Sequence, residues 1–199
     1  MSQAFEKSPL SIKEKLDGFE KYVRRQQLSR FLAKYELFKL NQNVKGSIVE
    51  CGVYQGSGIM GWAKLSAMLE PYAFDRRVFG FDTFEGFPEV NTKDLNAKEN
   101  NPKAKISGLN TGEAVYQDIL SCIEEYDENR FLNQFDKIEL IKGDATETIP
   151  SFIEKNPHLI VSLLFMDFDI YEPTKIALEH FLPRMPKGAI LAFDEFNNP

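Results

Sequence analysis

The chain has 199 residues, of which 43% are hydrophobic and 27% charged, a mix that suits one globular domain and argues against long disorder. Its net charge of −6 argues against a protein that binds nucleic acid through broad attraction to phosphates. The two cysteines form no CxxC motif and no apolar run is long enough to cross a membrane. We therefore expect a cytoplasmic protein with no membrane partner.

Residues 1–45 are predicted to be a helical segment, because apolar side chains recur near helical spacing from Ser11 to about Gln42, as one long or broken amphipathic helix. Residues 46–199 then alternate between two kinds of pattern. Apolar runs predict strands over residues 47–51, 77–81, 138–142, 159–166 and 189–193, and helical periodicity predicts helices over 57–70, 113–125, 146–155 and 173–182. This alternation indicates an α/β fold, a doubly wound and mostly parallel sheet within a single domain, residues 1–199.

The segment from residue 89 to residue 112 is polar and long for a loop inside a compact domain. Loops of this length are usually functional or disordered, and we expect a lid that closes over a bound substrate.

The turn after the first strand, Glu50-Cys51-Gly52-Val53-Tyr54-Gln55-Gly56-Ser57-Gly58, is rich in glycine. Glycine lets the backbone bend sharply and approach a ligand, and the amides at the following helix start can face a polar group. The spacing E-x-G-x-x-x-G differs from the dinucleotide fingerprint G-x-G-x-x-G. The turn therefore predicts a pocket for a nucleoside cofactor, and the alternative is an ordinary strand–helix turn.

Acidic residues follow the next strands, and in open parallel sheets ligands bind beyond the carboxyl ends of the strands. Asp82 ends the second strand, where a carboxylate can accept hydrogen bonds from a ribose diol or cap a turn. Asp144, in Gly143-Asp144-Ala145, could reach an adenine or cap the following helix.

A second group of acids follows the last two strands, namely Asp167, Asp194 and Glu195. Clustered carboxylates repel one another unless a cation or a proton compensates, and their hard oxygens suit magnesium or calcium. The alternative is that one of these acids is a base or a cap and that no metal binds.

These motifs together resemble the macrocin O-methyltransferase family, class I methyltransferases that depend on a metal and on S-adenosylmethionine and act on sugars. The resemblance covers about 150 residues and rests on VECGVYQGSG (49–58), FGFDTFEGFPE (79–89), GDATETIP (143–150), MDFDIYEPTKIALEHFLPRMPKGAI (166–190) and FDE (193–195). It implies a Rossmann-like fold and transfer of a methyl group to a hydroxyl of a sugar or related vicinal diol, a small-molecule acceptor.

The resemblance also implies roles for single residues. Glu50, Gly52 and Ser57 would surround the methionine part of the cofactor, Asp82 its ribose, and Asp144 with Ala145 its adenine. The residues expected to contact the cofactor are Glu50, Gly52, Val53, Tyr54, Gly56, Ser57, Asp82, Thr83, Gly143, Asp144, Ala145 and Asp167. A magnesium ion would bind at Asp167, Asp194 and Glu195, where the family commonly has an aspartate in place of Glu195, and Asp167 would also be the catalytic base.

Class I methyltransferases usually add an antiparallel hairpin after the fifth strand, and this sequence ends before one. We therefore expect either a chain truncated before the hairpin or a protein that dispenses with it. In both cases the exposed sheet edge could pair in a homo-oligomer. Two other functions stay open: a noncatalytic domain that binds S-adenosylmethionine, and an NAD-dependent oxidoreductase, which the glycine spacing disfavours.

Overall fold

The computed structural model describes residues 3–87, Asp94 and residues 109–194. The chain divides into two compact units, residues 1–37 and residues 38–199, which we describe one at a time. Among the described residues, no helix is long and apolar enough to cross a membrane.

The first unit contains short helices in place of one long helix. They are α1 (Gln3–Lys7), α2 (Ile12–Asp17), the 3-10 turn η1 (Phe19–Lys21) and the first part of α3 (Arg25–Asn41). Ser11 begins α2 with a capping box, since its hydroxyl accepts the Glu14 N–H while the Glu14 carboxylate accepts the Ser11 N–H. Of the two predicted forms, one long helix or a broken one, the structure has the broken one, whose first part, α2, ends at its C-cap, Gly18. The helix α1 was not predicted. No described side chain of residues 3–37 is buried.

The second unit contains a five-stranded parallel sheet with the order β3-β2-β1-β4-β5. Its strands are β1 (Ser47–Cys51), β2 (Val78–Asp82), β3 (Ile138–Lys142), β4 (Val161–Met166) and β5 (Ile190–Phe193). β1 and β3 have the predicted bounds, and the other strands start one or two residues later than expected. The chain reverses its direction of travel across the sheet between β1 and β4, so the predicted doubly wound sheet is confirmed.

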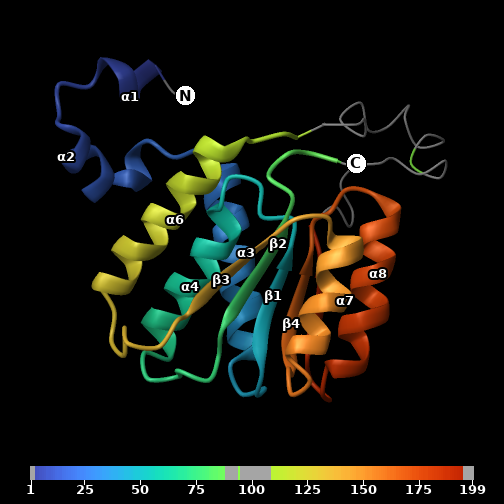
Figure 1. The fold of residues 1–199 in the computed structure, drawn as a ribbon. Helices are drawn as coiled ribbons and strands as arrows, with labels where there is room; N and C mark the ends of the chain where they lie inside the picture. The colour runs from blue at the N-terminus through green and yellow to red at the C-terminus, as the bar shows by residue number, and fades with distance from the viewer. Residues whose placement is uncertain (1–2, 88–93, 95–108, 195–199) are drawn as a thin grey trace. The chain divides into compact units, whose positions relative to one another are not determined.

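The helices of this unit cover both faces of the sheet (Figure 1). They are α4 (Ser57–Leu69), α6 (Glu113–Glu128), α7 (Ala145–Lys155) and α8 (Tyr171–Phe181), followed by the 3-10 turn η2 (Leu182–Arg184). α8 begins two residues before Pro173, the expected first residue. Pro173 still lies in the first turn of the helix, where a backbone N–H has no partner within the helix and its loss costs nothing.

The core follows from the alternation of side chains along the strands. Cys51, Phe81 and Met166 belong to the buried cluster that packs against α7 and α8, where the rings of Phe81 and Phe152 lie 5.2 Å apart. On the opposite face, Trp62 of α4 packs edge-on against Phe165. Because the helices cover both faces, the β1 and β4 side chains are buried throughout, as a central parallel sheet requires.

Candidate functional site

The turn between β1 and α4 is held tightly against neighbouring backbone. Gly52 has a φ of +97°, and a Cβ atom there would overlap the backbone oxygen of Asp167. The Asp167 N–H donates to the Cys51 oxygen at 2.7 Å, so the loop after β4 runs beside the turn. Gly56, with a φ of +81°, is the N-cap of α4 and packs under the side chain of Ile119. Only glycine fits at these two positions, which brings bare backbone to the carboxyl edge of the sheet.

Glu50 lies inside this turn rather than on its surface. The residue is 2% exposed, and a Cβ atom on Gly58 would overlap its carboxylate, so the acid occupies the space beside the first turn of α4. A helix N-terminus favours a negative charge because its first amides lack partners within the helix. Ser57, the first residue of α4, is exposed at the same turn.

Asp82 joins the turn after β1 to the turn after β2. One carboxylate oxygen accepts the backbone N–H groups of Val53 and Tyr54, both at 2.8 Å, and the other accepts the N–H of Phe84 at 2.7 Å. Tyr54 and Phe84 have φ values of +52° and +57°, a left-handed conformation that is unfavourable for such residues. Asp82 therefore acts as the turn cap that the sequence offered as one alternative.

The turns after β2 and β3 are closed by short hydrogen bonds. The Thr83 hydroxyl donates to the Gly86 oxygen at 2.7 Å. Asp144 is the N-cap of α7, since its carboxylate accepts the Thr146 N–H at 2.8 Å, and Ala145 begins the helix almost fully buried. The cap role considered for Asp144 is thus present, and Gly143 precedes it with a φ of +138°.

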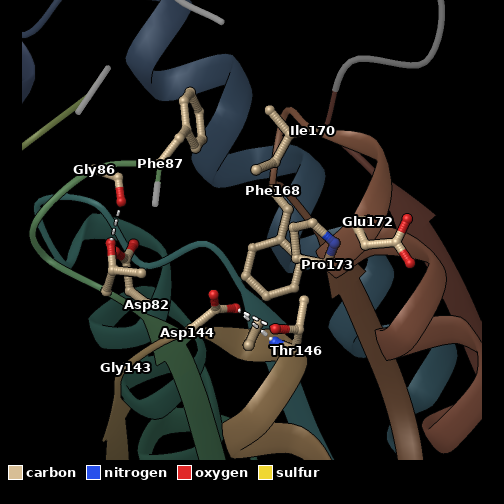
Figure 2. Close-up of a pocket in the computed structure, with 12 residues that line it drawn as sticks. Asp82, Gly86, Phe87, Gly143, Asp144, Thr146, Phe168, Ile170, Glu172 and Pro173 are labelled. Atoms are coloured by element: carbon tan, nitrogen blue, oxygen red, sulfur yellow. Dashed lines mark hydrogen bonds between the residues drawn. The ribbon is translucent and has the colours of Figure 1, made fainter. Parts of the chain in front are cut away.

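A cavity of about 220 Å³ lies at this edge of the sheet. It brings together five of the predicted cofactor residues with seven others; its lining consists of Asp82, Thr83, Gly86, Phe87, Gly143, Asp144, Ala145, Thr146, Phe168, Ile170, Glu172 and Pro173. Figure 2 shows Asp82 and Asp144 on one side of the cavity and Phe168, Ile170 and Pro173 on the other. The cavity thus combines hydrogen-bonding groups on one wall with apolar surface on the opposite wall, as small-molecule sites usually do.

The apolar wall was missed by sequence reasoning. Phe168 and Ile170 alternate with the acids of the segment Asp167-Phe168-Asp169-Ile170, which drew attention only as a source of carboxylates. The alternation of apolar and acidic residues could have predicted this wall. A loop that follows a buried strand and has an apolar side chain at every second residue is expected to bury those side chains on one face. Asp169 bends this loop with a φ of +59°.

Asp167 lines a second cavity, of about 340 Å³, on the other side of the same loop. Asp194 follows β5 and its N–H donates to the Met166 oxygen at 3.1 Å, so the expected adjacency of the two strand ends is confirmed. Glu195 lies outside the described residues. Within residues 3–87, 94 and 109–194, no group of three or more acidic, histidine or cysteine side chains is arranged to hold a metal ion. Asp167 and Asp194 are the described members of the expected metal site, and the strand ends that carry them are adjacent.

The predicted lid, residues 89–112, falls mostly outside the described residues. Asp94 is described, and its carboxylate accepts the N–H of Tyr171 at 2.9 Å, at the start of α8. Asp94 also lines the cavity that contains Asp167.

Charged groups also close the flank of the site beside β3. Lys142 donates to the Glu113 carboxylate of α6 at 2.6 Å, and this hydrogen bond raises the pKa of Lys142 and lowers that of Glu113. Beneath the site, burial raises the pKa of the Cys51 thiol well above its usual value, with the neighbouring Glu50 adding to the effect. Cys51 is therefore a buried apolar side chain and not a nucleophile.

Comparison with known proteins places this geometry in a family. The model of the macrocin-O-methyltransferase (TylF) family matches residues 22–198. A 4'-O-methyltransferase of Streptomyces olivaceus, which acts on 8-demethyl-8-(2,3-dimethoxy-alpha-L-rhamnosyl)-tetracenomycin C, is 30% identical over 79% of this chain and 55% of its own length. Mycinamicin III 3''-O-methyltransferase of Micromonospora griseorubida is 26% identical over 80% of this chain and 59% of its own. The chain thus spans little more than half the length of these relatives.

Solved structures agree with this assignment. The crystal structure of the calicheamicin methyltransferase CalS11 superposes with a TM-score of 0.92 at 32% identity, covering 100% of this chain and 76% of that one. The O-methyltransferase NovP, with a TM-score of 0.56 and 21% identity, shares the fold. The predicted class I methyltransferase fold is thereby confirmed. The chain belongs to the macrocin-O-methyltransferase family.

Proposed function

We propose that this chain is the cofactor-binding core of an S-adenosylmethionine-dependent O-methyltransferase that acts on a hydroxyl of a sugar or related vicinal diol. The observation that carries the proposal is the cavity at the ends of β2, β3 and β4, in a chain of this family. The two enzymes named above by their substrates are O-methyltransferases, and one of those substrates is a rhamnosyl-tetracenomycin. A further CalS11 structure is described as a TDP-rhamnose 3'-O-methyltransferase.

The cavity suits the adenosine part of the cofactor. Phe168, Ile170 and Pro173 offer apolar surface to a base, and the backbone at Gly143 and Asp144 offers hydrogen-bonding groups to its edge. The carboxylate of Asp82 lies where a ribose would reach it. Three N–H groups already bind that carboxylate, and an ionised carboxylate has about four acceptor positions. Asp82 can therefore accept one hydroxyl while it keeps both turns in place.

The methionine part would lie across Gly52, between the start of α4 and the loop that carries Asp167. S-adenosylmethionine supplies an electrophilic methyl group on a sulfonium. In the transfer, a bond forms between the acceptor oxygen and the methyl carbon while the carbon–sulfur bond breaks, and S-adenosylhomocysteine leaves. Asp167 would take the hydroxyl proton, because it lines the cavity next to Gly52. Most of the remaining acceleration would come from orientation of the two reactants.

We also propose that the reaction depends on magnesium, with Asp167, Asp194 and Glu195 as ligands. Hard carboxylate oxygens that leave positions open for substrate hydroxyls suit this ion. The test is methyl transfer measured before EDTA, after EDTA, and after Mg²⁺ is added back. Activity that survives complete chelation would remove the metal from the proposal and leave the transferase intact.

Calorimetry tests the cofactor. We expect S-adenosylhomocysteine to bind with one site per chain and NAD to give no heat of binding. Binding of NAD alone would overturn the proposal in favour of an oxidoreductase. Binding of S-adenosylhomocysteine without methyl transfer to any member of a panel of nucleotide sugars and glycosylated acceptors would support a noncatalytic domain.

The base is tested by a matched pair of substitutions. Asp167→Asn removes the proton acceptor at constant shape, and general-base loss typically lowers kcat by about 10²–10⁴-fold. Asp136→Asn makes the same chemical change at an exposed aspartate that precedes β3, at the other end of the sheet. The variant Asp136→Asn should retain wild-type kcat. Equal activity of the two variants would exclude Asp167 as the base.

A further inference from the structure

A third cavity, of about 210 Å³, lies at the amino ends of the strands, opposite the proposed cofactor site. Its walls come from the end of α4, the segment that leads into β2, the end of α6 and the segment that leads into β3. The lining includes Met68, Phe74, Tyr126, Phe131 and Lys137. No step of the proposed reaction uses any of these residues, and none was singled out by its sequence.

Three charged residues line this cavity, namely Lys137, Arg130 and Glu70, and Lys137 is the most deeply buried of them. The residue is 5% exposed, and its ammonium donates to the Ala73 oxygen at 2.7 Å. The two carboxylates that act on Lys137 also pair with other cations: Glu70 with Arg76 at 2.6 Å and Asp75 with Lys45 at 3.4 Å. Within the described part of the chain, Lys137 forms no ion pair. It is therefore a buried cation with no carboxylate in direct contact, an arrangement that an incoming anion would stabilise.

The mouth of the cavity is aromatic and open to solvent. Phe74 and Phe131 are 57% and 64% exposed, although both line the cavity. Each is held by a neighbouring ring, Phe74 by Phe135 at 5.3 Å between centroids and Phe131 by Tyr72 at 5.6 Å. Large apolar side chains gathered and exposed in this way mark surfaces that bind something.

We propose that this cavity is a second ligand site, which binds a small aromatic carboxylic acid with its carboxylate on the Lys137 ammonium and its ring between Phe74 and Phe131. At about 210 Å³ the cavity has room for a ligand with one aromatic ring. The ligand class follows from the lining: Lys137 and Arg130 are cations, the carboxylate of Glu70 is already paired with Arg76, and the aromatic rings supply apolar surface.

The charge state of Lys137 makes the binding depend on pH. Burial lowers the pKa of Lys137 to about 8; Glu70 and Asp75 act to raise it, while Arg130 and Arg76 lower it further. The amine is thus mostly charged at neutral pH. Between pH 7 and pH 9 its protonated fraction falls about tenfold, and the affinity for a carboxylate falls with it.

The test is a ¹⁹F NMR titration of the full chain with 4-fluorophenylacetate, repeated with the neutral 4-fluorophenylacetamide. We expect saturable binding of the acid, about tenfold weaker binding of the amide through loss of the charged partner, and undiminished binding of the acid in excess S-adenosylhomocysteine. The affinity for the acid should fall about tenfold from pH 7 to pH 9.

Lys137→Met keeps the length of the side chain and removes its charge, so it should bind the acid no better than the amide. Lys64→Met, at an exposed position of α4 outside the cavity, should behave as the wild type. Because replacing a buried cation that contacts no carboxylate by an apolar side chain does not weaken the fold, the melting temperature of Lys137→Met checks that the cavity survives. Equal affinity for acid and amide, competition by S-adenosylhomocysteine, or acid binding unchanged in Lys137→Met would overturn the proposal. None of these results depends on methyl transfer.

Discussion

Replacing Asp82 by asparagine separates its two possible roles, holding the turns and binding the ribose. The substitution keeps the shape of the side chain but turns one of its oxygens into an NH₂ group. That group must face either the N–H groups of Val53 and Tyr54 or the N–H of Phe84, all of which now donate to a carboxylate. A hydrogen bond to a charged group contributes about 1.5–3 kcal/mol. Since Asp82 is partly exposed, we expect a loss of about 2 kcal/mol in the free energy of unfolding.

A chain of this size loses about 2–4 °C in melting temperature per kcal/mol, so Asp82→Asn should melt roughly 4–8 °C lower. The measurement is made without cofactor, because ligand binding itself shifts the melting temperature. Asp75→Asn is the matched control. Asp75 is 53% exposed and pairs with Lys45 at 3.4 Å, so this change should cost less than ~1 kcal/mol. If Asp82→Asn melted with the control while its affinity for S-adenosylhomocysteine fell, the carboxylate would serve the ligand rather than the turns.

Three further predictions concern the backbone, the thiols and the pH dependence of stability. Gly52→Ala should destabilise the chain and abolish S-adenosylhomocysteine binding, because its Cβ has no room. Gly112 has a φ of +78°, but a Cβ there would make only an ordinary contact with Asn110 at 3.9 Å, so Gly112→Ala should cost about 1–2 kcal/mol. Equal melting temperatures of the two variants would contradict this difference. An Ellman titration of the native protein should label the exposed Cys122 at once and Cys51 only after denaturation, and rapid labelling of both would show that Cys51 is accessible. The Lys137 pKa is about 8 in the folded state and about 10.4 in the unfolded state. Between these pH values the unfolded chain binds more protons than the folded chain. The free energy of unfolding therefore rises with pH across that window, by up to about 3 kcal/mol. Denaturant melts of wild type and Lys137→Met should therefore differ less at pH 10 than at pH 7, and a constant difference would refute this account.

The strands of the sheet were predicted well because they are runs of apolar residues, which favour burial. The run from Leu159 to Met166 is apolar throughout, and such a run has few alternatives to a central strand. The errors lie at element ends, as with β4, which begins at Val161, and α8, which begins before Pro173. The start of a strand depends on where the neighbouring strand pairs with it. The start of α8 depends on which positions of its first turn tolerate a proline, which has no backbone N–H. The local sequence pattern indicates neither.

The cavity was predicted in part. Asp82, which ends β2, and Asp144, which precedes α7, line one cavity as expected, since parallel strands bring their carboxyl ends together. The other wall was not predicted, because Phe168 and Ile170 become a wall only when α8 turns back beside the sheet. Lys137 gave no signal at all, since a lysine before a strand is ordinarily exposed.

The amino-acid sequence by itself determined the order of strands and helices, the glycine turn and the line of acids that follows the strands, because these depend on periodicity and on the backbone freedom of single residues. The contacts and the burial of individual residues were determined only by the tertiary structure. Asp82 caps two turns because Val53, 29 positions away, brings its N–H to within 2.8 Å, and Lys137 becomes a buried cation because α4, α6 and β3 enclose it. Burial and hydrogen-bond partners across such distances exist only after the chain has folded.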